Sequence, residues 1–321
     1  MAKFRDPAPE RTSAFAQSDA AEADAVETVP ASTAPVSHDD LAVHDRSIGD
    51  IIRELRNLSA EQVEAVLAYQ RQHAVRFGEA AVALKLVTQD DVLFALSQQF
   101  HYPYAPESQR KANPELVALN QPFSAQAEAF RALRSQVVMR VWGEQQPRGA
   151  LAVISADHGD GRTFFAANLA VTLAQLGGGR TLLVDADLRG PRQHQLFKLD
   201  NRSGLSGILS GRSDKDTIQQ VASVPSLFVL PAGTTPPNPL ELVERPAFGL
   251  LIRELASKFD HVVVDTPAAT LGADASVISA RCGAALILAR KDESRVRSLQ
   301  DLMASLAGTS ARVAGVVVNE F

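Results

Sequence analysis

Residues 150–163 read "ALAVISADHGDGRT", a run of apolar residues followed at once by a loop that contains two glycines. The apolar run predicts a buried strand, and the residues after Thr163 have the periodicity of a helix. A glycine loop between a strand and a helix can turn its backbone N–H groups toward a phosphate, and the positive end of the helix attracts the same group. This stretch therefore predicts a phosphate-binding loop within an α/β fold.

The alternation of strand and helix continues along the chain from this loop. Apolar runs predict strands at 150–154, 180–185, 227–231, 261–265, 284–289 and 312–318. Helical periodicity predicts helices at 163–176, 240–257, 273–280 and 294–307. Such alternation indicates a doubly wound parallel sheet, and near-continuous runs such as "HVVVD" indicate strands that are buried on both faces. We assign this α/β domain to residues 124–321.

Two further motifs place carboxylates where predicted strands end. The segment "TLLVDADLRGP" at 181–191 carries Asp185 and Asp187, and "HVVVDTPA" at 261–268 carries Asp265. In an open α/β sheet, ligands bind beyond the carboxyl ends of the strands. Magnesium prefers phosphate oxygens, waters and one or two carboxylates, to which a hydroxyl can be added. We therefore predict a Mg²⁺ site formed by Thr163, Asp187 and Asp265.

Each motif taken singly also fits a plain alternative, because an aspartate after a strand is common in turns and helix caps. The occurrence of all three motifs at strand ends favours a nucleotide site, with ATP and Mg²⁺ as the predicted cofactors. The predicted nucleotide-binding residues in the loop and at the start of its helix are Gly159, Asp160, Gly161, Arg162, Thr163 and Phe164.

The loop departs from the usual pattern at Arg162, since a lysine normally precedes the final Ser or Thr. Arginine keeps the positive charge and donates hydrogen bonds in a planar fork, but it is bulkier than lysine and is not equivalent to it. Arg162 can still neutralise phosphate charge. We predict that nucleotide binding tolerates this exchange better than turnover does.

An internal repeat precedes the α/β domain. Residues 48–70 and 77–99 align with Gly49 opposite Gly78, and each copy predicts a short helix followed by a capped second helix. Ser59 has Gln62 three residues later, which is the capping-box pattern, and the second copy has an acidic version of it. Because two such small units bury little alone, we expect them to pack together as a helical domain at 41–105.

Composition limits the remaining possibilities. The chain has 321 residues, a net charge of −5 and one cysteine, Cys282, which rules out an intramolecular disulfide and fits a reducing compartment. The overall charge gives no indication of nucleic-acid binding. No run approaches the ~18 apolar residues of a membrane span, and the first residues lack a secretory signal. We expect a cytoplasmic protein with a disordered tail at 1–40, rich in Ala, Ser, Pro, Asp and Glu.

Between the repeat and the loop, residues 106–123 predict a linker with one short helix, and Ser124 is a plausible cap for the helix that follows. Glu128, Arg131 and Arg134 are spaced three apart, so they form one charged stripe on this helix. The stripe alone fits a solvated face with internal ion pairs.

The region 124–319 resembles the bacterial tyrosine kinases of polysaccharide export (BY-kinases), which have the deviant Walker type of phosphate-loop ATPase fold. The resemblance lies in the loop "SADHGDGRT" at 155–163, the "DADLR" motif at 185–189, the "DTPA" motif at 265–268, the "LPAGTTPPNPLELVERPAF" segment at 230–248 and the Glu-x-x-Arg-x-x-Arg element at 128–134. Arg162 in the loop and the residues after the second motif are similar to those of the chain-length-determinant-associated exopolysaccharide autokinases.

The resemblance implies roles for particular residues. Glu128, Arg131 and Arg134 would mediate ring assembly between subunits, and Asn319 would contact the adenine. Phosphoryl transfer depends on positioning and charge stabilisation, for which Asp187 and Arg162 are the predicted catalytic groups beside Asp185, which would activate the acceptor hydroxyl. The implied partner is a membrane chain-length determinant (polysaccharide co-polymerase), which would recruit the chain to the inner face of the plasma membrane.

The repeat, at about 45–105, resembles the N-terminal domain of type II secretion and pilus-assembly ATPases, most clearly in its second copy, from Arg76 to Gln99. Some of those relatives bind cyclic di-GMP through this element, so that ligand is one interpretation of the repeat. A docking module without a ligand is the interpretation that we favour.

The tyrosines leave the function partly open. The family carries a C-terminal tyrosine cluster as its autophosphorylation target, whereas the tyrosines here are Tyr69, Tyr102 and Tyr104. The principal hypothesis is an ATP-dependent protein-tyrosine autokinase that controls exopolysaccharide chain length and export. The alternatives are a nucleotide-switch ATPase and an ATP-binding adaptor that act on the same machinery without phosphorylating tyrosine.

Overall fold

The computed structural model describes residues 47–99, 113–143, 149–212 and 217–320. The predicted tail at 1–40 lies outside these ranges, as do Tyr102 and Tyr104. None of the described helices is long and apolar enough to cross a membrane.

The repeat forms four helices, which are α1 (Ile48–Arg56), α2 (Ala60–His73), α3 (Phe77–Ala83) and α4 (Gln89–Gln99). The capping box at Ser59 is present, because its hydroxyl accepts from the N–H of Gln62 while the Gln62 side chain accepts from the N–H of Ser59. Thr88 and Asp91 make the same reciprocal pair before α4. Local capping chemistry thus begins the second helix of each copy as the sequence predicts.

The two copies share one buried cluster, to which Ile52 and Val66 contribute from the first copy and Ala80 and Ala95 from the second. The close packing of α3 on α4 explains Gly78. A Cβ at this position would lie 2.6 Å from Cγ1 of Val92, which is closer than packed atoms approach each other.

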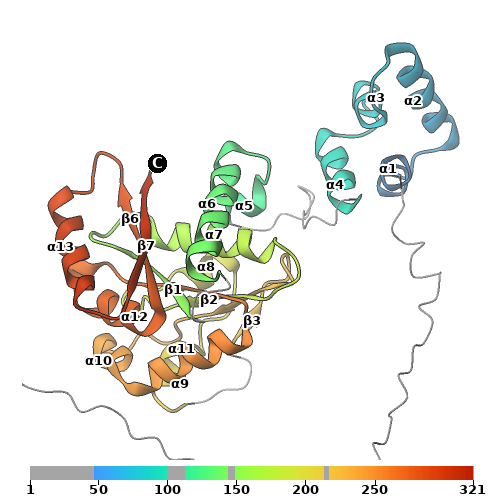
Figure 1. Cartoon of the computed structure of the whole chain (residues 1–321). Helices are drawn as coiled ribbons and strands as arrows, with labels where there is room; N and C mark the ends of the chain where they lie inside the picture. Colours follow the sequence, from blue (N-terminus) through green and yellow to red (C-terminus); the bar gives the residue numbers. More distant parts are fainter. Residues whose placement is uncertain (1–46, 100–112, 144–148, 213–216, 321) are drawn as a thin grey trace, which may run out of the picture. The chain divides into compact units, whose positions relative to one another are not determined.

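The α/β part contains seven strands, which are β1 (Ala150–Ser155), β2 (Thr181–Asp185), β3 (Gln219–Gln220), β4 (Leu227–Leu230), β5 (His261–Asp265), β6 (Gly283–Arg290) and β7 (Arg312–Asn319). They form one sheet in the order β3-β4-β2-β5-β1-β6-β7 (Figure 1). All neighbouring strands are parallel except the short edge strand β3, which pairs antiparallel with β4. The predicted parallel α/β sheet is confirmed, apart from β3, which is too short to produce a sequence pattern.

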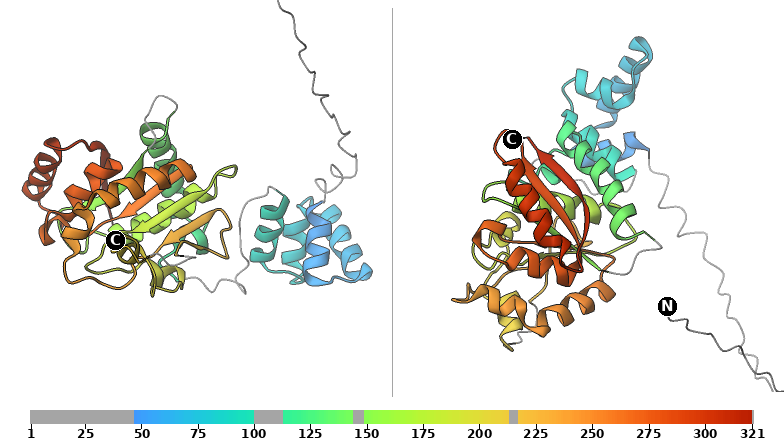
Figure 2. Two further views of the ribbon diagram at one scale, coloured as in Figure 1. Left: turned by 90° about the horizontal axis from the view of Figure 1, so that it is seen from below. Right: turned by 60° about the vertical axis from the view of Figure 1, so that its left-hand side comes forward.

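The helices of this part are α5 (Val117–Asn120), α6 (Ala125–Val141), α7 (Arg162–Ala174), α8 (Gln193–Phe197), α9 (Leu205–Leu209), α10 (Pro239–Glu244), α11 (Pro246–Lys258), the 3-10 helix η3 (Ala269–Leu271), α12 (Asp274–Cys282) and α13 (Val296–Ala307). They lie on both faces of the sheet, as the views in Figure 2 allow the reader to follow. One buried cluster packs α5, α6 and α7 on one face of the sheet. Another packs the four helices α10, α11, α12 and α13 on the opposite face. The doubly wound arrangement is therefore present.

One predicted helix is wrong in its extent. The helix expected at 240–257 is two helices, α10 and α11, which meet at Arg245. Arg245 has a ψ of 141°, and Pro246 follows it. A residue before proline is disfavoured in the helical region, and proline is favoured in the first turn of a helix. The signal for this break was in the sequence.

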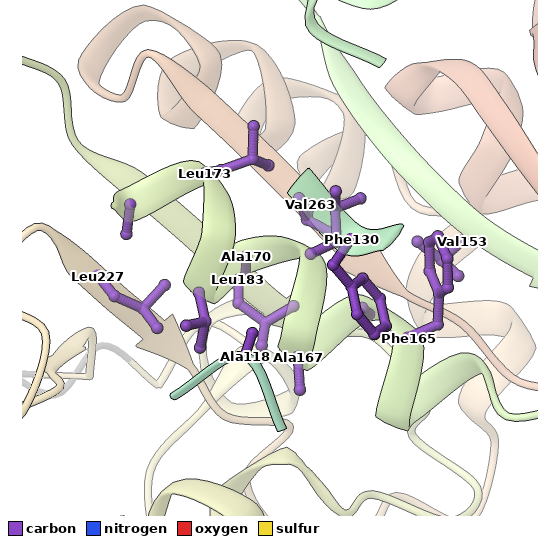
Figure 3. Close-up of a cluster of buried hydrophobic side chains, with 14 of the residues drawn as sticks. Ala118, Phe130, Val153, Phe165, Ala167, Ala170, Leu173, Leu183, Leu227 and Val263 are labelled. Atoms are coloured by element: carbon purple, nitrogen blue, oxygen red, sulfur yellow. The ribbon is translucent and has the colours of Figure 1, made fainter. Parts of the chain in front are cut away.

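The segment 113–120 contributes side chains to the core of the α/β part. It falls within the predicted linker at 106–123, and its short helix α5 was expected, but Leu116, Ala118 and Leu119 are buried in the core. Figure 3 shows Ala118 with other members of this cluster, among them Ala167 and Ala170 of α7. The linker prediction is therefore wrong for this segment, because its short apolar run packs against a helix that is distant in the sequence.

Candidate active site

The glycine loop between β1 and α7 has the backbone that a phosphate site requires. Gly159 and Gly161 both have a φ of 91°, a left-handed conformation that glycine adopts without steric cost. Gly161 is the N-cap of α7, which begins at Arg162. The loop N–H groups and the positive end of a 13-residue helix therefore stand together at the carboxyl end of β1.

A cavity of about 550 Å³ opens beside this loop. The predicted site residues that line it are Gly159, Gly161, Arg162, Thr163, Phe164 and Asp187. Of the residues predicted to bind nucleotide or metal or to act in catalysis, Asp160, Asp185, Asp265 and Asn319 are not among its lining. The tertiary structure thus brings six of these predicted residues to one cavity, and the other four do not line it.

Arg162 is held by the protein itself. Its Nε donates to the carbonyl of Thr266 at 2.9 Å, and its Nη1 donates to the carbonyl of Asp157 at 2.8 Å and to the hydroxyl of Ser155. Only 6% of the residue is exposed, although it lines the cavity. The guanidinium therefore joins the loop after β1 to the loop after β5. This geometry differs from the free phosphate-directed cation that the sequence predicts.

Asp160 and Asn319 are also engaged in shaping the loop. The Asp160 carboxylate accepts from the N–H of Asp157 at 3.1 Å and from the Ser294 hydroxyl at 2.9 Å. Asn319, at the end of β7, donates from Nδ2 to the carbonyl of Asp160 at 3.3 Å. These contacts fix the loop against Ser294, which follows β6, and against the last residue of β7. The predicted contact of Asn319 with adenine stays a prediction.

Asp185 and Asp265 end neighbouring strands in register, so the parallel pairing of β2 with β5 sets the two carboxylates side by side. Both residues are fully buried. Burial, with the Asp265 charge beside it, raises the pKa of Asp185 well above its ordinary value. Burial also raises the pKa of Asp265, to about 6, against hydrogen bonds from Gln193 and Thr163 that lower it. Two buried carboxylates of like charge thus stand at the edge of the site.

Gln193 is the site residue that sequence reasoning missed. It is fully buried at the start of α8, and its Nε2 donates to Oδ2 of Asp265 at 2.8 Å and to the carbonyl of Thr163 at 3.1 Å. Its backbone N–H donates to Oδ2 of Asp185 at 3.0 Å. One residue therefore fixes both buried carboxylates, and no local motif marks a lone glutamine for such a role.

The donor set fits a magnesium ion. Thr163 and Asp187 line the cavity, whereas Asp265 is fully buried and is not among its lining residues. Oδ1 of Asp185 and Oδ1 of Asp265 are buried without a hydrogen-bond partner among the described residues, so they remain open to a cation or its waters. No group of three or more His, Cys, Asp or Glu side chains forms a metal site within the described ranges. Phosphate oxygens and waters would supply the remaining ligands, as Mg²⁺ prefers.

Residues just before α5 and at its start form another part of the cavity wall. Pro114, Glu115 and Val117 line it, together with Arg192, which forms an ion pair with Glu115 at 2.8 Å. Asn168 of α7 anchors this wall, because its Oδ1 accepts from the N–H of Ala118 while its Nδ2 donates to the carbonyl of Glu115, both at 2.9 Å. The sequence pattern did not predict this wall.

The stripe on α6 is partly engaged within the chain. Arg131 contacts the carboxylate of Glu128 and the carbonyl of Pro122, and Arg134 donates to the carbonyl of Thr172 at 2.8 Å. The Glu128 side chain is 71% exposed. The internal ion pair of a solvated face is therefore present, and the ring-assembly role stays a prediction.

Sequence comparison places the chain near a set of kinases. The chain is 33% identical over 208 residues to CapB of Staphylococcus aureus, a match that covers 64% of this chain and 89% of CapB. It is 30% identical over 204 residues to the tyrosine-protein kinase YwqD of Bacillus subtilis, covering 64% of this chain and 85% of YwqD. It spans only 29% of the tyrosine-protein kinase Wzc of Salmonella typhi, with 30% identity over 210 residues. No protein-family model matches the chain.

Solved structures give a similar result. The kinase domain of Escherichia coli tyrosine kinase ETK is 30% identical, with a TM-score of 0.60 over 64% of this chain and 79% of that chain. The chimerical protein CapA2B2 is 31% identical, with a TM-score of 0.59 over 72% of this chain and 98% of that chain.

Proposed function

The chain belongs to the family of bacterial tyrosine-protein kinases, and from this premise we propose that it transfers the γ-phosphoryl group of ATP to a protein tyrosine. The observation that carries the proposal is the cavity at the carboxyl edge of the sheet, which brings the glycine loop and Asp187 together in front of the buried pair Asp185 and Asp265. This combination fits phosphate chemistry with a divalent cation.

Residues of the chain would position the ATP phosphates and the metal ion for the transfer. The loop N–H groups and the start of α7 hold the phosphates, and Arg162 keeps the loop in shape through its backbone contacts. Thr163 and Asp187 would hold Mg²⁺, which neutralises charge on the phosphates when it is bound. Gln193 orients Asp265 through its hydrogen bond to the carboxylate.

In the transfer step, the tyrosine oxygen forms a bond to the γ-phosphorus while the bond to the β–γ bridging oxygen breaks, so that ADP leaves. The hydroxyl proton passes to a carboxylate, and we assign this role to Asp185. Its raised pKa makes its carboxylate a better proton acceptor than an ordinary aspartate. Because Asp185 lies behind the cavity lining, the role requires the residues after β2 to move when substrates bind.

We also propose a cellular role, which the family resemblance of the sequence motifs supports. The kinase controls exopolysaccharide chain length and export, and it works with a membrane chain-length determinant that recruits it to the membrane. Ring assembly through Glu128, Arg131 and Arg134 is part of the proposal, supported by the exposure of Glu128. Cyclic di-GMP binding or docking by residues 45–105 also stays a prediction. The named kinases among the relatives favour the kinase over the switch ATPase and the adaptor.

The test is to incubate the full chain with Mg²⁺ and ATP labelled on its γ-phosphate, separate protein-bound from free phosphate, and map any modified residue. The Asp187→Ala variant is the control, because the substitution removes a carboxylate that lines the cavity. Label on tyrosine that disappears in the variant supports the kinase. Free phosphate without protein label supports the switch ATPase, and nucleotide binding without either product supports the adaptor.

A further inference from the structure

A second cavity, of about 390 Å³, lies at the opposite end of the sheet from the phosphate loop. It is lined by the first residues of three parallel strands, with Ala150 of β1, Gly283 of β6 and Arg312 of β7. The carboxyl ends of these strands face the other way, so this cavity shares no lining residue with the candidate active site.

The lining of this cavity has one sign of charge. Arg253 of α11, Arg281 of α12 and Arg312 contribute to it, and its lining includes no aspartate or glutamate from the part of the chain that the structure describes. The remaining surface includes apolar side chains such as Ile252 and Ala256. A positively charged rim around an apolar floor suits an anion that carries an apolar body.

Two of these arginines converge on one point. A Cβ placed on Gly249 of α11 would lie 3.7 Å from Nη1 of Arg253, 3.7 Å from Nε of Arg281 and 3.2 Å from Cδ of Arg281. The two guanidinium groups therefore both lie close to Gly249, which has no side chain. Within the described ranges, neither guanidinium takes part in an ion pair or a hydrogen bond. Like charges brought this close leave a place for a counter-ion between them.

The chemistry of that counter-ion follows from the donors. Each guanidinium presents a planar fork that matches two oxygens of a phosphate, and a phosphate monoester carries close to two negative charges at neutral pH. Guanidinium groups also stack on aromatic rings. The volume and the apolar floor leave room for a body larger than the phosphate alone.

We propose that this cavity binds an aryl phosphate monoester, through Arg253 and Arg281, with the aromatic ring against the apolar floor. The phosphotyrosine side chain is the member of this class that the proposed kinase reaction would make. That identification rests on the proposed function, whereas the binding of an aryl phosphate does not.

The experiment titrates phenyl phosphate into the full chain by calorimetry, with Mg²⁺ and saturating ADP present to fill the phosphate loop. We expect the Arg253→Gln and Arg281→Gln variants each to weaken binding about tenfold or more, since each removes charge-assisted hydrogen bonds. The matched control is Arg297→Gln, which changes an exposed arginine on α13 and leaves binding unchanged. Inorganic phosphate should bind more weakly than phenyl phosphate because it cannot use the apolar floor.

Two results would overturn the inference. One is phenyl phosphate affinity that neither arginine variant changes, with the thermal unfolding midpoints showing that both variants are folded. The other is equal affinity for inorganic phosphate and phenyl phosphate. A chain that labels no tyrosine but shows the expected arginine dependence would refute the proposed kinase and leave this inference standing.

Discussion

Replacing Gln193 by methionine should destabilise the fold and loosen the magnesium site together. Methionine has a similar length but no donor, so the 2.8 Å bond to Asp265 and the 3.1 Å bond to the carbonyl of Thr163 are both lost. The buried carboxylate of Asp265 loses a donor, which costs about 1–3 kcal/mol, whereas the Thr163 carbonyl belongs to the hydrogen-bond ladder of α7 and loses only a second donor. The loss of Oε1, which is buried without a partner among the described residues, offsets part of this cost. We expect a net loss of about 2 kcal/mol in the free energy of unfolding.

The assay is urea unfolding of the full chain without nucleotide, followed by titration of a fluorescent ADP analogue at several Mg²⁺ concentrations. Gln195→Met is the matched control, because Gln195 is exposed on the same helix and should change stability by less than about 0.5 kcal/mol. Since partners that orient metal ligands typically matter 10–100-fold, we expect Gln193→Met to weaken Mg²⁺-dependent ADP binding at least about tenfold. A variant as stable as the control, with unchanged Mg²⁺ dependence, would refute the reasoning.

Three further predictions concern the loop and its surroundings. Asn168→Ala removes the side chain that anchors the 113–120 segment, and urea unfolding should show that the free energy of unfolding falls by about 2–4 kcal/mol. A loss below about 1 kcal/mol would contradict this anchoring role. In Arg162→Lys, the lysine cannot reproduce the forked guanidinium contacts with two loops, so we expect thermal unfolding to show a loss of about 1–2 kcal/mol in the free energy of unfolding. A variant as stable as the parent protein would show that these contacts are dispensable. Burial raises the pKa of Asp265 to about 6 from 3.8, so the folded chain binds this proton more tightly than the unfolded chain does. Between pH 3.8 and about pH 6, this group therefore makes the free energy of unfolding fall as pH rises. Unfolding titrations from pH 4 to about pH 6 should show a shallower fall in Asp265→Asn, and equal slopes in the two proteins would contradict this cause.

Sequence reasoning succeeded where the determining interactions are local. The strand runs, the capping box at Ser59 and the glycines at 159 and 161 each depend on residues within a few positions of one another. The break between α10 and α11 was equally local, since Pro246 marks it, but the apolar periodicity across Arg245 concealed it. Elements as short as β3 and α8 contain too few residues to show a period.

The sequence by itself determined the fold class and the approximate place of the site, because parallel strands carry whatever follows them to one edge of the sheet. Only the tertiary structure decided which side chains meet there. The order β2-β5-β1 sets Asp185 beside Asp265, and Gln193 reaches both from a helix that lies outside either strand motif. Arg162 faces the Thr266 carbonyl 104 residues away, and Asn168 holds a segment 50 residues before it. Such contacts depend on which elements pack together, and the periodicity of any one segment does not contain that information.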